Sequence, residues 1–257
     1  MRATSLSQTA LLLCLQTSLS SQLTIPTTTT HGKYPSHPTR TLGNVSVADT
    51  KLVREALDFA KGHTSSDAIW NHVMRGWLYG TLIISHNATL QSTVDPETHA
   101  IAAILHDLGW DQTANSSVIS PDRRFEVDGA VAAGRFLATH TKWDDHRIQL
   151  VWDSIALHTQ ESIFRYKQDT VLVTGEGIQM DFRGASAGVT EEEYDAVLRA
   201  FPKTRFRETV NETFVWLCES KPETTYDTFM QPWGDNYVKN YSSQGNRAFD
   251  LISALPI

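Results

Sequence analysis

The sequence predicts a mainly α-helical protein with one folded domain, over about residues 47–220. Apolar side chains recur at helical intervals along this range, and helix-capping residues stand before the apolar runs. Apolar residues make up 40% of the 257 and charged residues 20%, a balance typical of a chain with a buried core. No internal repeat or change of composition divides the range, so we expect a single all-α domain.

The first helices are expected from local signals. Residues 53–60 place apolar side chains at i, i+3, i+4 and i+7, which indicates one buried stripe. Residues 65–67 supply capping groups for a helix over 68–85. Asp, Pro and Glu at 95–97 form a strong helix start, because Asp caps, Pro tolerates the first turn and Glu favours the helix dipole. The following helix, 98–108, is apolar on nearly all sides and should lie in the core.

The second half is also mainly helical. Further helices are expected at about 123–140, 143–158, 190–201 and 203–219. Thr190 and Glu193 form the signature of a capping box. Residues 168–184 have a mixed pattern, in which the β-branched run at 170–173 indicates an extended stretch. The C-terminal extension, 221–257, has weak periodicity, and we expect it to pack on the domain or to be partly disordered.

The N-terminus predicts export. Arg2, an apolar run at 10–15 and small residues before a cut after Ser20 are typical of a signal peptide over 1–20. The alternative is a frayed apolar N-terminus. The apolar run is too short to anchor the chain in a membrane. Residues 21–46 are rich in Thr and Pro and predict a linker.

Glycosylation sequons support a secreted protein or one that stays in the secretory pathway. Five of the eight asparagines stand in such sequons: Asn44, Asn87, Asn115, Asn211 and Asn240. Cys14 would leave with the signal peptide, so Cys218 would have no internal disulfide partner. We expect Cys218 to be a small buried residue rather than a nucleophile, because its sequence neighbours supply no activating base.

The charge balance disfavours a nucleic-acid partner. The formal net charge is −7, and no basic run stands out. We therefore expect a small-molecule substrate, with no nucleic-acid partner and no membrane. The oligomeric state is not predicted.

The strongest chemical signal is His106-Asp107 at the end of the apolar helix. Each polar side chain needs compensation in a buried position, and one divalent metal ion would satisfy both. The alternative is a capping Asp beside a hydrogen-bonded His. His72, His158 and Asp181 widen the pattern, because His, His-Asp, His and Asp then occur in order along one helical domain.

This pattern resembles the HD superfamily of helical metal-dependent hydrolases, and more narrowly its cyanamide hydratase-like members. The similarity covers roughly 50–220. It is carried by five segments: 72–80 (HVMRGWLYG), 103–109 (AILHDLG), 124–130 (RFEVDGA), 152–159 (WDSIALHT) and 180–184 (MDFRG). The signal peptide and the linker are not part of the resemblance.

The resemblance implies that one divalent metal is held by His72, His106, Asp107 and Asp181. Zn is the expected ion, with Fe as the alternative. Such a metal lowers the pKa of bound water and supplies hydroxide near neutral pH. Glu126 stands where HD proteins with two metals commonly have a His, three residues before Gly-Ala. A single metal is therefore favoured.

Three residues are expected to assist catalysis. Glu126 would act as a base or orient water or substrate, and the alternative is an ion pair with Arg123, Arg124 or Arg75. His158 would face the pocket and contact substrate or a second metal; otherwise it caps its helix. Arg75 lies three residues after His72 on nearly the same helix face and would clamp a carboxylate or phosphate, or simply pair with Glu126.

The function expected from the resemblance is addition of water to a small C–N unsaturated substrate such as cyanamide. A metal-dependent phosphohydrolase is the main alternative, and a tailoring enzyme of secondary metabolism is also compatible. Glu126 disfavours a two-iron oxygenase, and the full ligand set disfavours a binding protein without activity. The aromatic residues expected to line the pocket are Trp77, Tyr79, Trp110 and Phe125.

Overall fold

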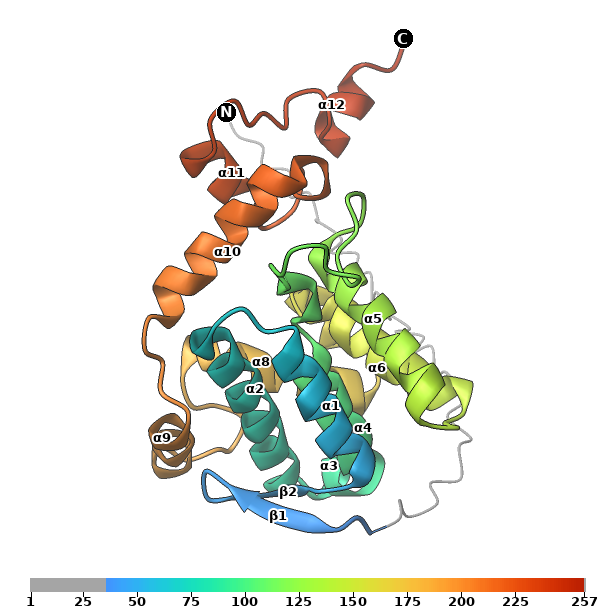
Figure 1. The fold of residues 1–257 in the computed structure, drawn as a ribbon, viewed down its shortest axis with the longest axis vertical. Coiled ribbons are helices and arrows are strands. Elements are labelled where there is room, and N and C mark those ends of the chain that lie inside the picture. Colours follow the sequence, from blue (N-terminus) through green and yellow to red (C-terminus); the bar gives the residue numbers. More distant parts are fainter. Residues whose placement is uncertain (1–35, 257) are drawn as a thin grey trace, which may run out of the picture. The chain divides into compact units, whose positions relative to one another are not determined.

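The computed structural model describes residues 36–256 (Figure 1). The expected signal peptide and residues 21–35 of the expected linker lie outside this range. Most of the described chain is helical, and its strands form one two-stranded sheet. The prediction of a mainly all-α domain is therefore confirmed. Among residues 36–256, no helix combines the length and apolar character needed to cross a membrane.

Six helices form the bundle that carries the site: α1 (Lys51–Gly62), α2 (Asp67–Ser85), α4 (Pro96–Leu105), α5 (Phe125–His140), α6 (Asp145–Leu157) and α8 (Asp169–Arg183). The short helices α3 (Ala88–Thr93), η1 (Leu108–Trp110) and α7 (Glu161–Phe164) connect them. α4 is the central helix: residues 97–105 are all buried, and it contacts α1, α2, α5, α6 and α8. The expectation of a core helix at this place is confirmed.

Local capping signals explain several helix starts. The Ser66 side chain accepts a hydrogen bond from the backbone of α2, and Asp95 caps α4 with Pro96 in the first turn. The box of Thr190 and Glu193 begins α9 (Glu191–Ala200). Each of these caps satisfies backbone N–H groups that the first helical turn leaves without a partner.

The linker expected over 21–46 is wrong at its C-terminal end. β1 (Thr39–Leu42) and β2 (Val45–Ala48) form an antiparallel hairpin there, with Leu42 opposite Val45. Gly43 and Asn44 form the turn with positive φ angles of 52° and 66°, as a two-residue hairpin turn requires. Val45 and Val47 point into the core. The composition is typical of a linker. The strand forms because β2 alternates between buried and exposed positions and so places Val45 and Val47 on the core side.

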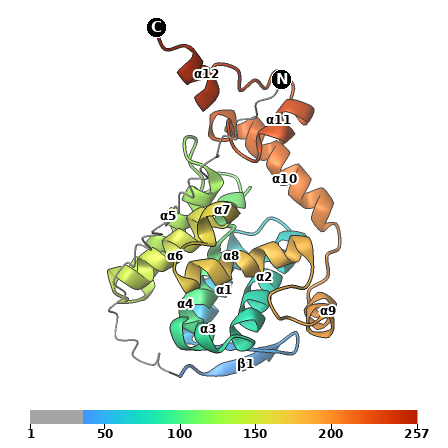
Figure 2. The same ribbon diagram turned by 180° about the vertical axis from the view of Figure 1, so that it is seen from behind.

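The extended stretch expected at 170–173 is also wrong, because these residues lie in the first turns of α8. Val171 and Val173 are fully buried there. Packing in the core outweighs the β-propensity of the run. α8 lies against α2 over much of its length (Figure 2).

Glycines allow this close approach of α8 and α2. A β-carbon added at Gly177 would lie 2.5 Å from the backbone nitrogen of Gly80 and 2.6 Å from the carbonyl oxygen of Gly76. The two helices therefore touch backbone to backbone at this point. Their close contact brings Asp181 of α8 within hydrogen-bond distance of His72 of α2.

Gly177→Ala is expected to destabilise the protein by about 1–3 kcal/mol, the usual cost of overpacking a tight interior. Gly134→Ala is the matched control, because a β-carbon at that helical position on α5 meets nothing within 4 Å. The control should be neutral or stabilising by up to about 1 kcal/mol. Urea unfolding of both variants measures the difference, and equal stabilities would contradict the backbone contact.

The C-terminal part continues through α10 (Phe206–Ser220), η2 (Pro222–Thr224), α11 (Gln231–Tyr237) and α12 (Ala248–Ser253). α10 contacts both α2 and α11. The first part of the extension packs on α10, because Met230 is fully buried in a second apolar cluster with Phe214 and Cys218. α12 leaves Phe249 and Ile252 exposed. Cys218 is buried and free, and burial raises the pKa of its thiol, which fits the expected apolar role.

Candidate metal centre

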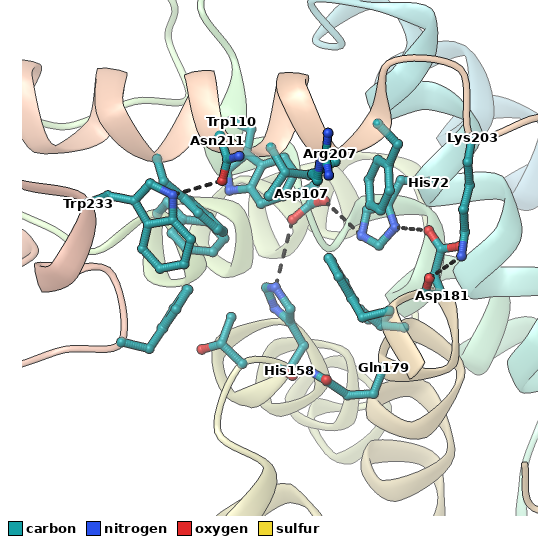
Figure 3. Close-up of a pocket in the computed structure, with 18 residues that line it drawn as sticks. His72, Asp107, Trp110, His158, Gln179, Asp181, Lys203, Arg207, Asn211 and Trp233 are labelled. Carbon is teal, nitrogen blue, oxygen red and sulfur yellow. Dashed lines mark hydrogen bonds and ion pairs between the residues drawn. The ribbon is translucent and has the colours of Figure 1, made fainter. Parts of the chain in front are cut away.

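The C-terminal ends of α4 and α6 meet α2 in the core, and residues from all three helices lie around one point; Figure 3 shows His72, Asp107 and His158 there. His72 lies in the middle part of α2, His106 and Asp107 follow the last residue of α4, and His158 follows the last residue of α6. Successive side chains on a regular helix point about 100° apart. Asp107 has left helical geometry, with φ −102° and ψ 20°. Adjacent His106 and Asp107 can therefore face the same position.

Four side chains converge on this position. The Nε2 atom of His106 lies 3.3 Å from Nε2 of His72 and 3.0 Å from Oδ2 of Asp107. The distance from Nε2 of His72 to the same oxygen is 3.5 Å. His158 places its Nε2 3.7 Å from Oδ1 of Asp107. Tetrahedral ligands at zinc bond lengths are separated by about 3.3 Å, so the spacing of His72, His106 and Asp107 fits one ion, and His158 lies beside this group at the other oxygen of Asp107.

The Asp107 carboxylate is the feature that favours binding of a cation. The residue is 5% exposed, and within residues 36–256 neither of its oxygens finds a hydrogen-bond partner. Leaving an ionised carboxylate buried without hydrogen bonds is costly. His72, His106 and Asp107 form a buried group whose ligand atoms could hold a metal ion. The expectation of a possible metal site at His106-Asp107 is confirmed in this form.

The opposite ring nitrogens are already engaged. Nδ1 of His106 lies 2.8 Å from the carbonyl oxygen of Ala103, and Nδ1 of His158 lies 2.7 Å from that of Ile155. Because a carbonyl only accepts, each Nδ1 donates its hydrogen, and each neutral ring presents the Nε2 lone pair to the centre. This is the orientation that outer hydrogen bonds give to metal-binding histidines.

The electrostatics keep most of these rings neutral. Burial lowers the pKa of His72, and it lowers the pKa of His158 to about 4. Burial also opposes a charge on His106, but the adjacent Asp107 carboxylate outweighs it and leaves the pKa of His106 raised. The same interaction outweighs the burial of Asp107 and holds the pKa of that carboxyl below its usual value. The centre therefore carries an ionised carboxylate.

Asp181 occupies a different place from the one expected of a ligand. Its Oδ2 lies 2.7 Å from Nδ1 of His72, on the edge of the ring that faces away from Asp107 (Figure 3). Its oxygens also accept two hydrogen bonds of 2.7 Å from Arg75, and Lys203 lies 3.2 Å from Oδ1. In this arrangement Asp181 orients His72, and His158 is the fourth residue at the centre.

Arg75 clamps a carboxylate, but that of Asp181. The side chain is fully buried, and the guanidinium binds Asp181 and the carbonyl oxygens of Phe201 and Pro202. The alternative pairing with Glu126 is not formed, since Glu126 pairs with a different residue. Arg75 neutralises Asp181 and ties α2 to the loop before α10.

Asp181→Asn is expected to keep one metal per chain at saturating metal but to weaken affinity about 10–100-fold, the usual effect of removing an outer hydrogen-bond partner. His158→Ala removes a group at the centre and serves as the comparison. Competition with a chromogenic chelator measures both affinities. Complete loss of metal from the Asn variant, with His158→Ala unaffected, would show that Asp181 is a ligand.

Glu126 adopts the alternative arrangement considered from the sequence. It is 1% exposed and pairs with Arg124, one of the three arginines proposed as its partner. Its Oε1 also accepts a hydrogen bond of 2.6 Å from the hydroxyl of Thr159, which lines the cavity beside the centre. Glu126 itself is not among the cavity-lining residues, so its contact with that space goes through Thr159.

The cavity has a volume of about 580 Å³ and opens onto His72, Asp107 and His158. Trp110 and Phe125 line it as expected. Trp77 and Tyr79 do not, because they are fully buried in the main core. Trp77 and Tyr79 follow His72 on α2, and the helix directs them into the bundle.

Sequence reasoning missed half of the cavity wall. The additional lining residues come from the end of α8, from α10 and from the C-terminal extension; they include Phe182, Phe206, Phe214, Phe229 and Trp233. The density of aromatic residues between 201 and 233 is the signal that could have found them. Without the fold, nothing in the sequence connects these rings to His106-Asp107.

A second buried polar group contains His37, Asp95 and Glu97. Arg147 pairs with both carboxylates, and His37 lies 2.8 Å from Asp95. The guanidinium already supplies the positive charge that a metal would bring. This group therefore fastens the segment before β1 to the start of α4.

No family model matches the chain, and no curated protein matches it. The similarity to HD proteins therefore remains a prediction from the five sequence segments.

Proposed function

We propose that the protein is a metal-dependent enzyme of the HD type that adds water to an unsaturated C–N group, as a hydratase or hydrolase. The observation that carries this proposal is the buried Asp107 carboxylate, which accepts no hydrogen bond from the described residues and faces three imidazole Nε2 atoms. The type of bond attacked comes from the resemblance to cyanamide hydratase-like proteins.

The donor set supports one divalent ion. Two imidazole nitrogens and one carboxylate oxygen suit Zn²⁺ with a place left for water, and Fe²⁺ also accepts such ligands. A bound ion of this kind lowers the pKa of water and supplies a hydroxide nucleophile near neutral pH. His72, His106 and Asp107 would hold the ion, and His158 would lie beside it. The buried pair of Asp181 and Arg75 fixes the ring of His72.

Glu126 has a defined role in this proposal. The Thr159 hydroxyl donates to Glu126 and also lines the cavity, so Thr159 can relay a proton between a bound substrate and the carboxylate. Arg124 pairs with Glu126 and holds its carboxylate in place. Glu126 would thus act through Thr159 rather than by direct contact with substrate.

The cations at the cavity favour this reaction over phosphate ester hydrolysis. Of the described residues that line the cavity, Lys203 and Arg207 are the Lys and Arg side chains. Lys203 is held by Asp181 and by the hydroxyl of Tyr194, at 2.9 Å. The Arg207 side chain is 86% exposed. A phosphoryl group is usually held by arginines or lysines that are free to bind it.

The size of the cavity favours a substrate larger than cyanamide. A space of about 580 Å³ falls in the range of pockets that enclose drug-sized ligands. The alternative of a tailoring enzyme in secondary metabolism gains support from this volume, because such an enzyme would perform the same hydration on a larger molecule.

Elemental analysis followed by activity assays tests the proposal. The purified full chain should contain one equivalent of Zn or Fe, and the metal-loaded protein should hydrate cyanamide or an organic nitrile. A phosphomonoester panel with 4-nitrophenyl phosphate is the comparison. Activity on phosphomonoesters alone would favour the phosphohydrolase, and absence of bound metal in the intact protein would overturn the proposal.

Export through the secretory pathway is the remaining part of the proposal. All five sequon asparagines are exposed, which is what glycosylation needs. Asn211 also lines the cavity, but attachment of a glycan at Nδ2 would leave Oδ1 to accept the hydrogen bond from Trp233. A mass decrease on enzymatic deglycosylation of the secreted protein would support export, and an unmodified mass would count against it.

A further inference from the structure

Aromatic rings begin directly at the candidate metal centre. Phe206 stacks on His72 with ring centroids 4.9 Å apart and planes inclined by 29°. Trp110 lies nearly parallel to the same imidazole, at 6.1 Å and 17°. The part of the cavity nearest to the reacting group is therefore bounded by flat apolar surfaces.

The aromatic wall continues away from the centre through Phe214. The Phe214 ring makes edge contacts with Trp110 at 5.5 Å, Phe229 at 5.4 Å and Trp233 at 4.9 Å. Phe125 contacts both Trp110 and Phe229. Rings from η1, α5, α10 and α11 thus form one connected surface (Figure 3). Surfaces of this kind favour an aromatic ligand, which they can meet face to face or edge to face.

The wall also contains an unused hydrogen-bond donor. Trp110 is 3% exposed, and in the described part of the chain its indole N–H has no partner. The neighbouring indole of Trp233 is satisfied, because it donates to Oδ1 of Asn211 at 2.9 Å. A buried donor without an acceptor costs about 1–3 kcal/mol, which a ligand acceptor would recover. Trp110 lines the cavity and stacks near His72, so a ligand in the cavity could supply that acceptor.

We propose that the cavity selects an aromatic substrate in which the ring system carries a nitrile or amide-like acceptor. The rings of Phe214, Phe229 and Trp233 would enclose the aromatic body, and Trp110 would donate to the acceptor beside the metal centre. This inference rests on the proposed function, since it names the substrate class of that site. A substrate as small as cyanamide would leave most of the aromatic wall uncovered.

Binding to metal-free protein tests the inference separately from catalysis. The probe is 6-hydroxy-2-naphthonitrile, and acetonitrile is the nitrile without a ring system. Isothermal titration calorimetry should give at least about 100-fold tighter binding of the naphthonitrile, because the aromatic body buries far more apolar surface. Equal affinities for the two nitriles would overturn the inference.

Three variants identify the contacts. Trp233→Ala should weaken binding of the naphthonitrile about 10-fold, and Trp233→Phe should restore most of it, since ring contacts contribute about 0.5–1.5 kcal/mol beyond burial. Trp110→Phe keeps a ring but removes the donor, so it should weaken the naphthonitrile about 3–10-fold while leaving 2-naphthol, which has no nitrile, unaffected. Unchanged affinity in Trp233→Ala, or an equal loss for both ligands in Trp110→Phe, would contradict these contacts.

The outcomes separate the two proposals. Tight, Trp233-dependent binding without turnover in metal-loaded protein would support the aromatic cavity and overturn the proposed hydration. Metal-dependent hydration of cyanamide, together with weak binding of the naphthonitrile, would support the proposed function and overturn the aromatic substrate class.

Discussion

His106→Ala is expected to reduce bound metal from one equivalent to near zero. His106 lies closest to both neighbouring ligands, with Nε2 3.3 Å from His72 and 3.0 Å from Asp107. Removing it leaves an opening in the middle of the group and two ligands that no longer surround one position. Because divalent ions bind through several ligands at once, loss of the central one should abolish stable binding.

Elemental analysis after dialysis measures this effect, and two further variants make it specific. His146→Ala is the matched control, since His146 is exposed on α6 and does not belong to the His, His-Asp, His and Asp pattern. It should keep one equivalent. Asp107→Asn preserves side-chain shape while removing the charge, so it guards against misfolding of the alanine variant. A full equivalent of metal in both His106→Ala and Asp107→Asn would refute the assignment.

Arg75→Met is expected to destabilise the metal-free protein by about 3–5 kcal/mol, the typical cost of removing one partner of a buried ion pair. Asp181 is 1% exposed and accepts two hydrogen bonds from Arg75. The hydrogen bonds from His72 and Arg75 outweigh the burial of Asp181 and keep the pKa of its carboxyl far below the usual value. Without Arg75, His72 and Lys203 would be the partners left to this carboxylate among the described residues.

Arg183→Met provides the matched control, because Arg183 pairs with Glu161 at a half-exposed surface position. It should change the free energy of unfolding by less than about 1 kcal/mol, as exposed ion pairs usually do. Urea unfolding of both variants gives the comparison. Full stability of Arg75→Met combined with a specific loss of activity would instead restore the substrate clamp first expected of this residue.

Local signals in the sequence carried much of the fold. Capping by Ser66, Asp95 and Thr190 acts within one helical turn, so it can be recognised without knowing the partner helices. The apolar run at 100–105 of α4 likewise indicates a place in the core. Local propensity predicts an extended stretch at 170–173, but burial decides its conformation: Val171 packs with Leu150 and Phe164, and Val173 lies in the main core.

The candidate centre also has features that the sequence indicates and features that only the tertiary structure decides. A His-Asp pair at the end of a buried helix indicates a metal site from the sequence alone, because buried polar groups need compensation. The sequence also placed His158 and Asp181 in the right neighbourhood. Their roles depend on which edge of the His72 ring each one faces, and only the packing of α2 against α8 decides that.

The sequence by itself determined a helical domain, its main helix starts and a His-Asp centre in the core. Tertiary structure alone decided that Arg75 neutralises Asp181, that Glu126 reaches the cavity through Thr159, and that α10 and α11 complete an aromatic wall. The physical reason is the separation along the chain of the residues that interact. Capping and periodicity act between residues a few positions apart, whereas ion pairing and cavity shape depend on side chains brought together from distant parts of the chain.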